Sequence, residues 1–229
     1  MPSDPLSDAR IVDAWHKNAA PWTEAVRQQQ IESRRLVTNQ AIIDAVTGGS
    51  PPPRTALDIG CGEGWLVRAL AERGIRATGV DVVPDLIERA TRAGGGEFRV
   101  ASYEAVADGA LALTVDAAVA NFSLIGKESV DRLLARVPQL LTPRGRFIIQ
   151  TLHPAVATGD LPYVDGWREG SWAGFGAAFS DPAPWYFRTA ESWVRLLVAS
   201  GLRLLELREP VHPISRKPAS LILIADTSG

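Results

Sequence analysis

The sequence predicts an α/β fold in which a mostly parallel sheet carries helices on both faces. Short apolar runs alternate with longer amphipathic segments across residues 55–152, as expected of strands joined by crossover helices. A glycine-rich turn at residues 60–64 joins the first such run to the first such segment. Two further apolar runs, at residues 202–209 and 220–226, are separated by a connector too short for a crossover helix. They must therefore pair antiparallel.

The chain begins with a helical stretch, residues 1–50, which we expect to form a cap. The first helix is predicted around residues 7–16, and a longer, broken one spans residues 22–46. The run Gly-Gly-Ser-Pro-Pro-Pro at residues 48–53 cannot continue a helix and makes a connector into the first strand. The remainder, residues 51–229, is predicted to be one domain.

Residues 55–66 indicate a strand, a tight turn and the start of a helix. An apolar run, interrupted by Asp58, precedes Gly60, Gly62 and Gly64. Glycines at alternate positions allow positive φ and bring bare backbone N–H groups close to a ligand. An acid inside a buried strand needs partners, so Asp58 is expected to bond turn amides or to face a cationic ligand. The stretch therefore predicts a ligand-binding corner.

The spacing of these glycines disfavours a dinucleotide-binding fold. The fingerprint G-x-G-x-x-G places its third glycine five residues after the first. Here Gly64 follows Gly60 by four residues, and Trp65 holds the fifth position. A large indole there argues against the close helix–strand packing that the fingerprint needs. An NAD(P)-dependent Rossmann oxidoreductase nevertheless stays open as an alternative.

Residues 57–64, Leu-Asp-Ile-Gly-Cys-Gly-Glu-Gly, resemble the first motif of class I S-adenosylmethionine-dependent methyltransferases. A second matching element is the run Ala-Thr-Gly-Val-Asp-Val at residues 77–82, a strand that ends in an acid. Asp81 lies 21 residues beyond Gly60, close to the spacing at which an acid meets ribose hydroxyls. The alternative role of Asp81 is a helix cap ahead of Pro84.

The resemblance implies a Rossmann-like, seven-stranded, mostly parallel sheet with an antiparallel C-terminal hairpin and a helical N-terminal extension. It also implies S-adenosyl-L-methionine as the cofactor and S-adenosyl-L-homocysteine as the product. The glycine turn is expected to hold the amino acid end, Asp81 the ribose, and Ser102 with Tyr103 the adenine. The cofactor contacts implied in this way are Asp58, Gly60, Cys61, Gly62, Gly64, Asp81, Val82, Ser102, Tyr103, Asn121, Phe122 and Arg34.

The later elements place polar residues on one rim of the sheet. Ligands of doubly wound sheets bind outside the carboxyl ends of the strands, so Asn121 and Phe122, at the end of the fourth strand, are placed to meet cofactor and substrate. Ser123 is more simply a cap or turn residue. The expected order after the turn is helix 66–73, strand 77–82, helix 84–92, strand 98–101, strand 115–124, helix 129–141 and strand 145–152.

His153 follows the fifth strand on the same rim. Because histidine titrates near neutral pH, we predict it to accept a proton from a hydroxyl or amine during methyl transfer. The alternative is a capping or packing histidine beside Pro154. No group of histidine, cysteine and acidic residues has metal-ligand spacing, so no metal is expected.

Residues 155–187 are rich in aromatics but lack clear periodicity, which is typical of a lid or binding loop. Within the same domain, this insertion is expected to overhang the site and exclude water, or else to pack on the N-terminal helices. In the methyltransferases that this chain resembles, such a helical prefix often acts as a lid over the cofactor mouth, and an arginine of the prefix can pair with the cofactor carboxylate. The alternative is that its arginines are solvated and its tryptophans only pack. The predicted substrate contacts are Trp15, Trp22, Trp172, Trp185 and Tyr186.

Composition narrows the class of substrate. The chain of 229 residues has a net charge of −2, which disfavours a nucleic acid partner. A lone cysteine excludes an intrachain disulfide, and no apolar run approaches the ~20 residues of a membrane span. The polar start of the sequence does not resemble a signal peptide. We therefore expect a cytoplasmic location. The sequence thus predicts methyl transfer to a small, partly apolar metabolite. A non-catalytic S-adenosylmethionine-binding module is an alternative, and the acceptor atom and oligomeric state stay open.

Overall fold

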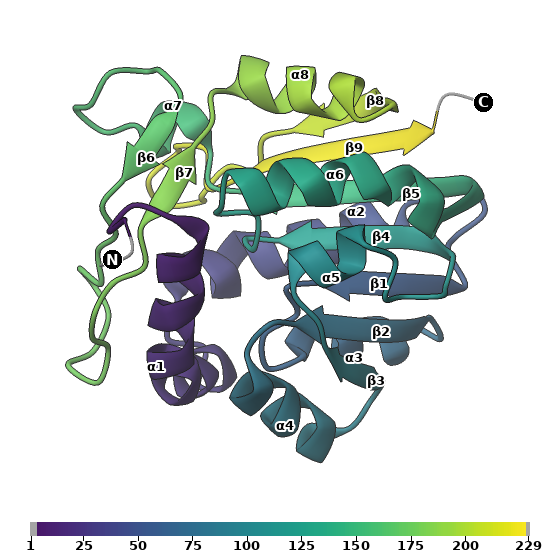
Figure 1. Cartoon of the computed structure of the whole chain (residues 1–229), viewed down its shortest axis with the longest axis horizontal. Coiled ribbons are helices and arrows are strands. Elements are labelled where there is room, and N and C mark those ends of the chain that lie inside the picture. Colours follow the sequence, from purple (N-terminus) through teal and green to yellow (C-terminus); the bar gives the residue numbers. More distant parts are fainter. Residues whose placement is uncertain (1–3, 228–229) are drawn as a thin grey trace.

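The computed structural model describes residues 4–227 and contains a seven-stranded sheet of order β3-β2-β1-β4-β5-β9-β8 (Figure 1). Strands β1 to β5 run parallel, whereas β9 pairs antiparallel with both β5 and β8. The predicted mostly parallel sheet with a closing antiparallel hairpin is therefore confirmed. The strands are β1 (Thr55–Ile59), β2 (Arg76–Asp81), β3 (Glu97–Val100), β4 (Val115–Asn121), β5 (Leu141–Thr151), β8 (Leu202–Arg208) and β9 (Leu221–Thr227).

Helices cover both faces of this sheet (Figure 1). One apolar layer lies between the sheet and α5, α6 and α8, and the other between the sheet and α2, α3 and α4. The central strand β4 shows both layers, because Ala118 and Ala120 pack on one side and Ala117 and Val119 on the other. The helices are α2 (Asn39–Thr47), α3 (Trp65–Ala71), α4 (Pro84–Ala93), α5 (Tyr103–Ala107), α6 (Glu128–Leu140) and α8 (Ala190–Ala199).

The N-terminal helix α1 (Asp8–Arg27) is continuous, so the predicted break after residue 16 is wrong. Pro21 lies inside the helix without ending it. Residues on both sides of the proline are buried, among them Ala14 and Ala25, and tertiary packing of one face outweighs a local preference. After α1 the chain makes a short π-helix, η1 (Arg34–Thr38), and then enters α2.

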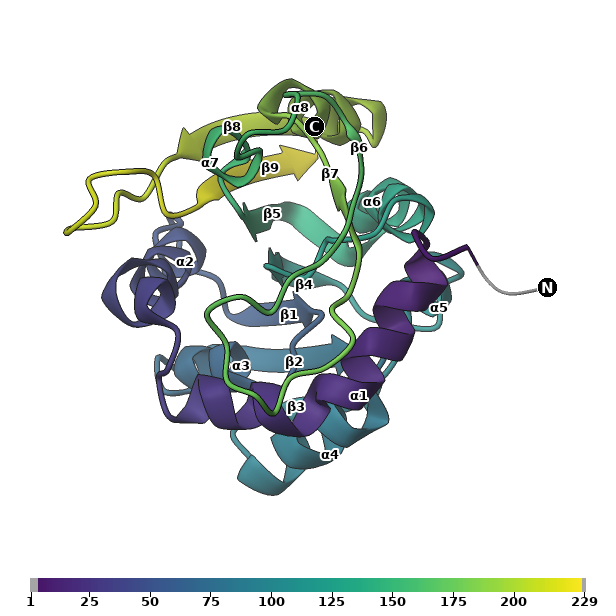
Figure 2. The same ribbon diagram turned by 90° about the vertical axis from the view of Figure 1, so that its left-hand side faces the viewer.

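The two N-terminal helices have different places in the fold. Ile42, Ile43 and Val46 of α2 belong to the apolar layer under the sheet. In contrast, α1 lies across the carboxyl ends of the parallel strands (Figures 1 and 2). Of the two N-terminal helices in the predicted cap, α1 therefore overhangs the sheet edge, whereas α2 packs on a face of the sheet. No helix in the described part of the chain is both long and apolar enough to cross a membrane.

The aromatic insertion contains short regular elements: α7 (Pro154–Ala157), β6 (Gly166–Arg168) and β7 (Trp185–Phe187). Strands β6 and β7 pair antiparallel in a separate two-stranded sheet. Between them, the loop at residues 171–181 runs over α1 (Figure 2). The insertion and α1 therefore lie on the same edge of the main sheet.

Asp116 joins the connector before β1 to the start of β4. Its carboxylate accepts hydrogen bonds from the backbone N–H groups of Arg54 and Thr55, at 2.9 and 3.1 Å, and from the hydroxyls of Thr55 and Thr142, at 3.2 and 3.1 Å. Desolvation alone raises the pKa of Asp116, but these hydrogen bonds outweigh it and hold the pKa below its usual 3.8. Ionised Asp116 therefore stabilises the folded state.

We expect Asp116→Ala to lower the free energy of unfolding at pH 7 by about 1–3 kcal/mol, because the donors of Arg54, Thr55 and Thr142 lose the half-buried carboxylate that they bond. Because the folded pKa is depressed, this contribution is present above about pH 4 and is lost as pH falls through the folded pKa. Urea denaturation of wild type and variant should thus converge as pH is lowered from 7 towards 3. Asp160→Ala, at an exposed aspartate, is the control. A difference that is as large at pH 3 as at pH 7 would contradict this account.

Candidate active site

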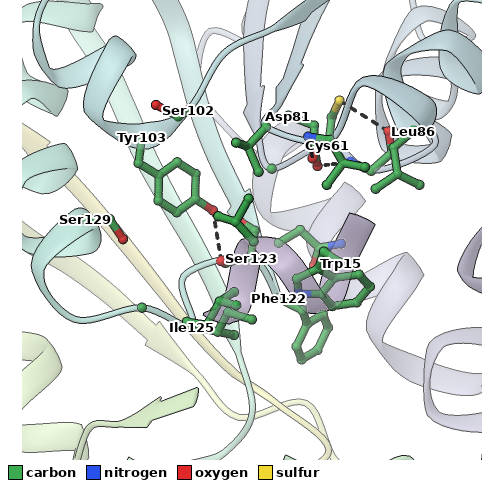
Figure 3. A pocket seen from close by; sticks show the side chains of 18 of the residues that line it. Trp15, Cys61, Asp81, Leu86, Ser102, Tyr103, Phe122, Ser123, Ile125 and Ser129 are labelled. Atoms are coloured by element: carbon green, nitrogen blue, oxygen red, sulfur yellow. Dashed lines mark hydrogen bonds between the residues drawn. The ribbon is translucent and has the colours of Figure 1, made fainter. Parts of the chain in front are cut away.

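A cavity of about 280 Å³ lies beneath α1 at the carboxyl ends of β1, β2 and β4 (Figure 3). Segments that are far apart in the sequence meet there, because parallel strands end at one edge of the sheet. The predicted site residues that line it are Trp15, Trp22, Arg34, Asp58, Gly60, Cys61, Gly62, Asp81, Val82, Ser102, Tyr103, Asn121 and Phe122.

The glycine turn after β1 is tied to β2 by backbone hydrogen bonds. The N–H of Gly60 donates to the carbonyl of Val80 at 2.8 Å, and the N–H of Gly62 donates to Asp81 Oδ2 at 2.9 Å. Gly62 has φ +57°, and a Cβ there would meet only Trp22 Nε1, at 3.6 Å. The backbone of the turn is therefore bare at Gly62, where it faces the cavity.

Gly64 does not line the cavity, although the sequence placed it among the cofactor contacts. It adopts φ +83°, and a Cβ there would lie 2.6 Å from Phe98 and 3.0 Å from Ala90. The glycine is thus needed for close packing of the turn against α4 and β3. Trp65, one residue later, begins α3 and lines the cavity in its place.

Asp58 is 2% exposed, and its Oδ1 has no hydrogen-bond partner among the described residues. Burial raises the pKa of Asp58 to about 7; the neighbouring Asp81 adds to this rise, and Arg34 opposes it. Buried polar atoms in folded proteins are almost always paired. An orphaned carboxylate oxygen on a cavity wall therefore indicates a ligand that brings its own N–H or O–H donor.

Arg34 supplies the positive charge of the cavity wall. Its guanidinium lies between two indoles, 5.5 Å from the ring centroid of Trp22 and 5.1 Å from that of Trp65. Burial lowers the pKa of Arg34 to about 10, so the side chain stays cationic at neutral pH. Arg34 opens the π-helix η1, and the neighbouring Arg35 is exposed. Such π-turns are frequent at functional sites.

Asp81 ends β2 with both carboxylate oxygens engaged. Oδ2 accepts from Gly62 N–H and Oδ1 from Val83 N–H, each at 2.9 Å. Burial raises the pKa of Asp81, and the hydrogen bonds from Val83 and Gly62 oppose the rise. A carboxylate has about four acceptor sites, so Asp81 retains capacity for a ligand hydroxyl. It both ties the turn and faces the cavity.

Ser102 and Tyr103 have structural partners of their own (Figure 3). The Ser102 hydroxyl caps α5 by accepting from Ala105 N–H at 3.2 Å. The Tyr103 hydroxyl donates to the carbonyl of Ser123 at 2.9 Å, and the Ser123 hydroxyl donates to the carbonyl of Ile59 at 2.6 Å. Burial raises the pKa of Tyr103 above its usual value, so this phenol is a donor rather than a base.

The end of β4 presents two residues in unusual states. Asn121 Oδ1 is buried without a partner in the described structure, as Asp58 Oδ1 is. Phe122 has φ +55°, a left-handed conformation that is strained for a bulky side chain, and its N–H donates to the carbonyl of Gln150 at 2.7 Å. Strained backbone of this kind clusters at functional sites.

Besides Gly64, four predicted residues lie outside the cavity. The His153 ring, at Nε2, pairs with Glu209 Oε1 at 2.7 Å, which directs it to the loop after β8. Trp172 packs edge-on against Trp15, with centroids 5.8 Å apart, and so forms a second layer behind the wall. Trp185 and Tyr186 belong to β7 and also do not line the cavity.

The cavity wall also includes residues that were not predicted as site residues from the sequence. Ile11 precedes Trp15 by four positions, and both face the cavity from α1. This spacing puts two residues on the same face of a helix, so the position of Ile11 could have been predicted from that of Trp15. Glu63 is 1% exposed and pairs with Arg27 at 2.8 Å and Arg68 at 2.7 Å. The other additional residues are Asp8, Ala9, Val12, Trp65, Val83, Leu86, Glu104, Ser123, Ile125, Gly126 and Ser129.

Comparison with known proteins gives consistent matches. A family model described as a methyltransferase domain matches residues 31–207. An uncharacterised methyltransferase of Schizosaccharomyces pombe is 26% identical over 168 residues, which cover 70% of this chain and 62% of that protein. A malonyl-[acyl-carrier protein] O-methyltransferase of Serratia marcescens is 25% identical over 171 residues, covering 73% and 61%. The match thus spans about three fifths of the length of each of these relatives.

A solved structure shares the fold over almost the whole chain. The 1,6-didemethyltoxoflavin-N1-methyltransferase of Burkholderia thailandensis, with 1,6-didemethyltoxoflavin and S-adenosylhomocysteine bound, superposes with a TM-score of 0.67. The two sequences are 20% identical, and the alignment covers 96% of this chain and 88% of that one. This likeness establishes the architecture.

The buried Asp58 predicts a pH-dependent cost to stability. Its folded pKa of about 7 lies above the unfolded value of 3.8, so the contribution of Asp58 to stability is most favourable below about pH 4, becomes less favourable as pH rises from about 4 to about 7, and is constant above that. Asp58→Asn, which resembles the protonated acid, should raise the free energy of unfolding at pH 8 by on the order of 1–4 kcal/mol. Near pH 4 the two proteins should be equally stable. Chemical denaturation at pH 4 and 8 is the measurement, and an unchanged or lower stability of the variant at pH 8 would exclude the raised pKa.

Proposed function

Because this chain belongs to the class I S-adenosylmethionine-dependent methyltransferases, we propose that it transfers the methyl group of this cofactor to a small, partly apolar acceptor in the cavity beneath α1. When bound, the cofactor supplies an electrophilic methyl group on a sulfonium. The chain therefore has to bind, align and shield the reactants rather than form covalent bonds to them. Family membership also removes the nicotinamide-dependent oxidoreductase from consideration.

The observation that carries the proposal is the pair of complementary charges in the cavity. S-adenosylmethionine ends in an amino acid, with one ammonium and one carboxylate. Asp58 Oδ1 is an unpaired buried acceptor, and Arg34 is a cation on the same cavity wall. We assign the ammonium to Asp58 and the carboxylate to Arg34, whose planar guanidinium suits bidentate pairing. The bare backbone at Gly62 leaves room beside them, whereas Gly60 is packed against Ser123 and Tyr103.

The nucleoside is assigned to the neighbouring strand ends. Asp81 has acceptor capacity left for ribose hydroxyls, and Val82 lies next to it on the cavity wall. Tyr103 and Phe122 offer aromatic surface for the adenine, and Asn121 Oδ1 is an unpaired acceptor for a ligand N–H. Ser102 already caps α5, so we expect its contribution to come from the backbone as much as from the hydroxyl.

The acceptor is assigned to the part of the cavity that α1 covers. Ile11, Trp15, Phe122 and Ile125 give it an apolar and aromatic wall, which supports a small, partly apolar molecule. No histidine or lysine lines the cavity in the described chain, and burial raises the pKa of Cys61 as it does that of Tyr103. We therefore propose an acceptor atom that is nucleophilic at neutral pH without a strong base.

Turnover separates this proposal from a non-catalytic binding module. The purified chain is incubated with S-adenosylmethionine and a library of small metabolites, and release of S-adenosylhomocysteine is measured. Release that depends on one acceptor class supports the enzyme. Tight cofactor binding without release for any acceptor favours the binding module.

Asp81→Ala should weaken S-adenosylhomocysteine binding by about 1–3 kcal/mol, or roughly 5- to 150-fold, because hydrogen bonds to a charged group are lost. Isothermal titration calorimetry measures the change. Asp85→Ala, an exposed acid four residues further on in the first turn of α4, is the matched control and should bind as wild type does. Equal affinity of Asp81→Ala and wild type would mean that the ribose lies elsewhere.

Arg34→Lys separates the amino acid end from the nucleoside. A lysine keeps the charge but loses the flat guanidinium between Trp22 and Trp65, so S-adenosylhomocysteine should bind about tenfold more weakly. Binding of 5′-methylthioadenosine, which lacks the amino acid, should not change. Calorimetry with both ligands tests this, with Arg35→Lys as the control at an exposed arginine. A similar loss for both ligands would rule out the carboxylate assignment.

A further inference from the structure

A buried asparagine on α1 bonds to the backbone of the aromatic insertion. Asn18 is 0% exposed. Its Nδ2 donates to the carbonyl of Ser180 at 2.7 Å and to that of Ala14 at 2.8 Å, while its Oδ1 accepts from the N–H of Ser180 at 3.0 Å. The amide thus pairs with both backbone groups of one residue that is 162 positions away. Such a reciprocal pair fixes the loop relative to α1 in one orientation.

Behind the cavity wall, the loop at residues 171–181 builds a second aromatic layer. Trp15 and Trp22 line the cavity and contact each other edge-on, with centroids 5.1 Å apart. Trp172 lies 5.8 Å from Trp15, and Phe175 lies 6.3 Å from Trp22. Phe179 completes the layer at 4.7 Å from Trp172. The loop itself does not line the cavity, so any effect of a ligand on it passes through α1.

The carbonyl of Ser180 is the point where these contacts meet. It accepts hydrogen bonds from Asn18 Nδ2 and also from Trp172 Nε1, at 2.9 Å. The next residue, Asp181, has φ +47° and forms ion pairs with Arg10 and Lys17 of α1. The loop is therefore held to the helix by the hydrogen bonds between Asn18 and Ser180 and, beside them, by the two ion pairs of Asp181.

Helix α1 is in turn anchored at both ends to the main domain. At its start, Asp8 accepts from the N–H groups of Lys127 and Ser129, at 2.8 and 2.6 Å, where α6 begins. At its end, Arg27 pairs with the buried Glu63 at 2.8 Å. Between these anchors α1 lies across the carboxyl ends of the strands (Figure 2). The middle of the helix carries Asn18 and also Trp15, which lines the cavity.

We propose that α1 and the 171–181 loop form a single two-layered lid, in which Asn18 is the positioning residue that transmits occupancy of the cavity to the outer layer. A ligand that contacts Trp15 and Trp22 holds α1 in place, and Asn18 carries this order to Trp172, Phe175 and Phe179. The outer layer in turn sets the position of the indole wall that the acceptor meets. The proposal rests on the cofactor site proposed above.

The isosteric change Asn18→Asp tests the coupling between α1 and the 171–181 loop. A carboxylate cannot donate a hydrogen bond to the carbonyl of Ser180 or of Ala14. Instead, one of its oxygens takes the place of Nδ2 and faces both carbonyl oxygens, which repel it. The side-chain volume is nearly unchanged. The matched control is the reverse change, Asp13→Asn, on the exposed face of the same helix, where Asp13 makes a 3.9 Å ion pair with Arg10.

Chymotrypsin cleavage reads the outer layer directly, because its preferred sites in the loop are Trp172, Phe175 and Phe179. Cleavage rates at these bonds are followed by mass spectrometry with and without S-adenosylhomocysteine at ten times its dissociation constant. In wild type and in Asp13→Asn, the ligand should slow cleavage by roughly tenfold, since it binds only the closed lid. In Asn18→Asp, basal cleavage should rise and the ligand should slow it less than about twofold, because opening of the loop no longer requires displacement of α1.

The outcomes separate the two proposals. Equal protection in wild type and Asn18→Asp, or no protection of wild type when calorimetry shows that the ligand binds, would overturn the lid. Failure of wild type to bind S-adenosylhomocysteine at all would instead overturn the cofactor site. If circular dichroism shows that Asn18→Asp is unfolded, Asp181→Ala, which removes the ion pairs of the loop with Arg10 and Lys17, takes its place. Its basal cleavage should rise and its protection should fall, and wild-type behaviour of this variant would also refute the lid.

Discussion

The carboxylate of Asp81 is the interaction on which the arrangement of the site depends. It accepts from the N–H of Gly62 in the turn after β1 and from the N–H of Val83 before α4. One side chain thereby fixes the ends of two adjacent strands relative to each other and keeps the bare face of the turn towards the cavity. The carboxylate has further acceptor sites that a ligand in the cavity can use. Asp81 can therefore hold the turn and bind a ligand at the same time.

Unsatisfied groups in the cavity follow from this arrangement. Asp58 and Asp81 are buried close together, and burial with mutual repulsion raises the pKa of Asp58. Asn121 Oδ1 and Asp58 Oδ1 have no partners in the described chain, and Phe122 holds a left-handed backbone. Each of these features costs stability. In the proposed function, the ammonium of the cofactor offsets the cost at Asp58, and a ligand N–H offsets the cost at Asn121.

The strands and most helices were predictable, because short apolar runs between turns and amphipathic segments report local burial. The positions of Gly60, Gly62 and Asp81 on the wall of one cavity were predictable from their spacing in the sequence. The role of Gly64 was not, because only the fold places Phe98 and Ala90 against it. His153 shows the same limit: a position at the end of a strand does not say whether the ring turns inward, and here it pairs with Glu209. The insertion gave no periodicity from which to place Trp172 behind Trp15, since its contacts with α1 are entirely long-range.

Proton release on cofactor binding tests the central claim most directly. At pH 7, Asp58 with a pKa of about 7 is about half protonated in the free protein, and an ammonium beside it favours the ionised form. Calorimetric titration of the wild-type protein with S-adenosylhomocysteine, in buffers of different ionisation enthalpy, should therefore show release of up to about half a proton per ligand at pH 7, falling towards zero at pH 9. Binding with no proton release at pH 7, or no binding at all, would contradict the account.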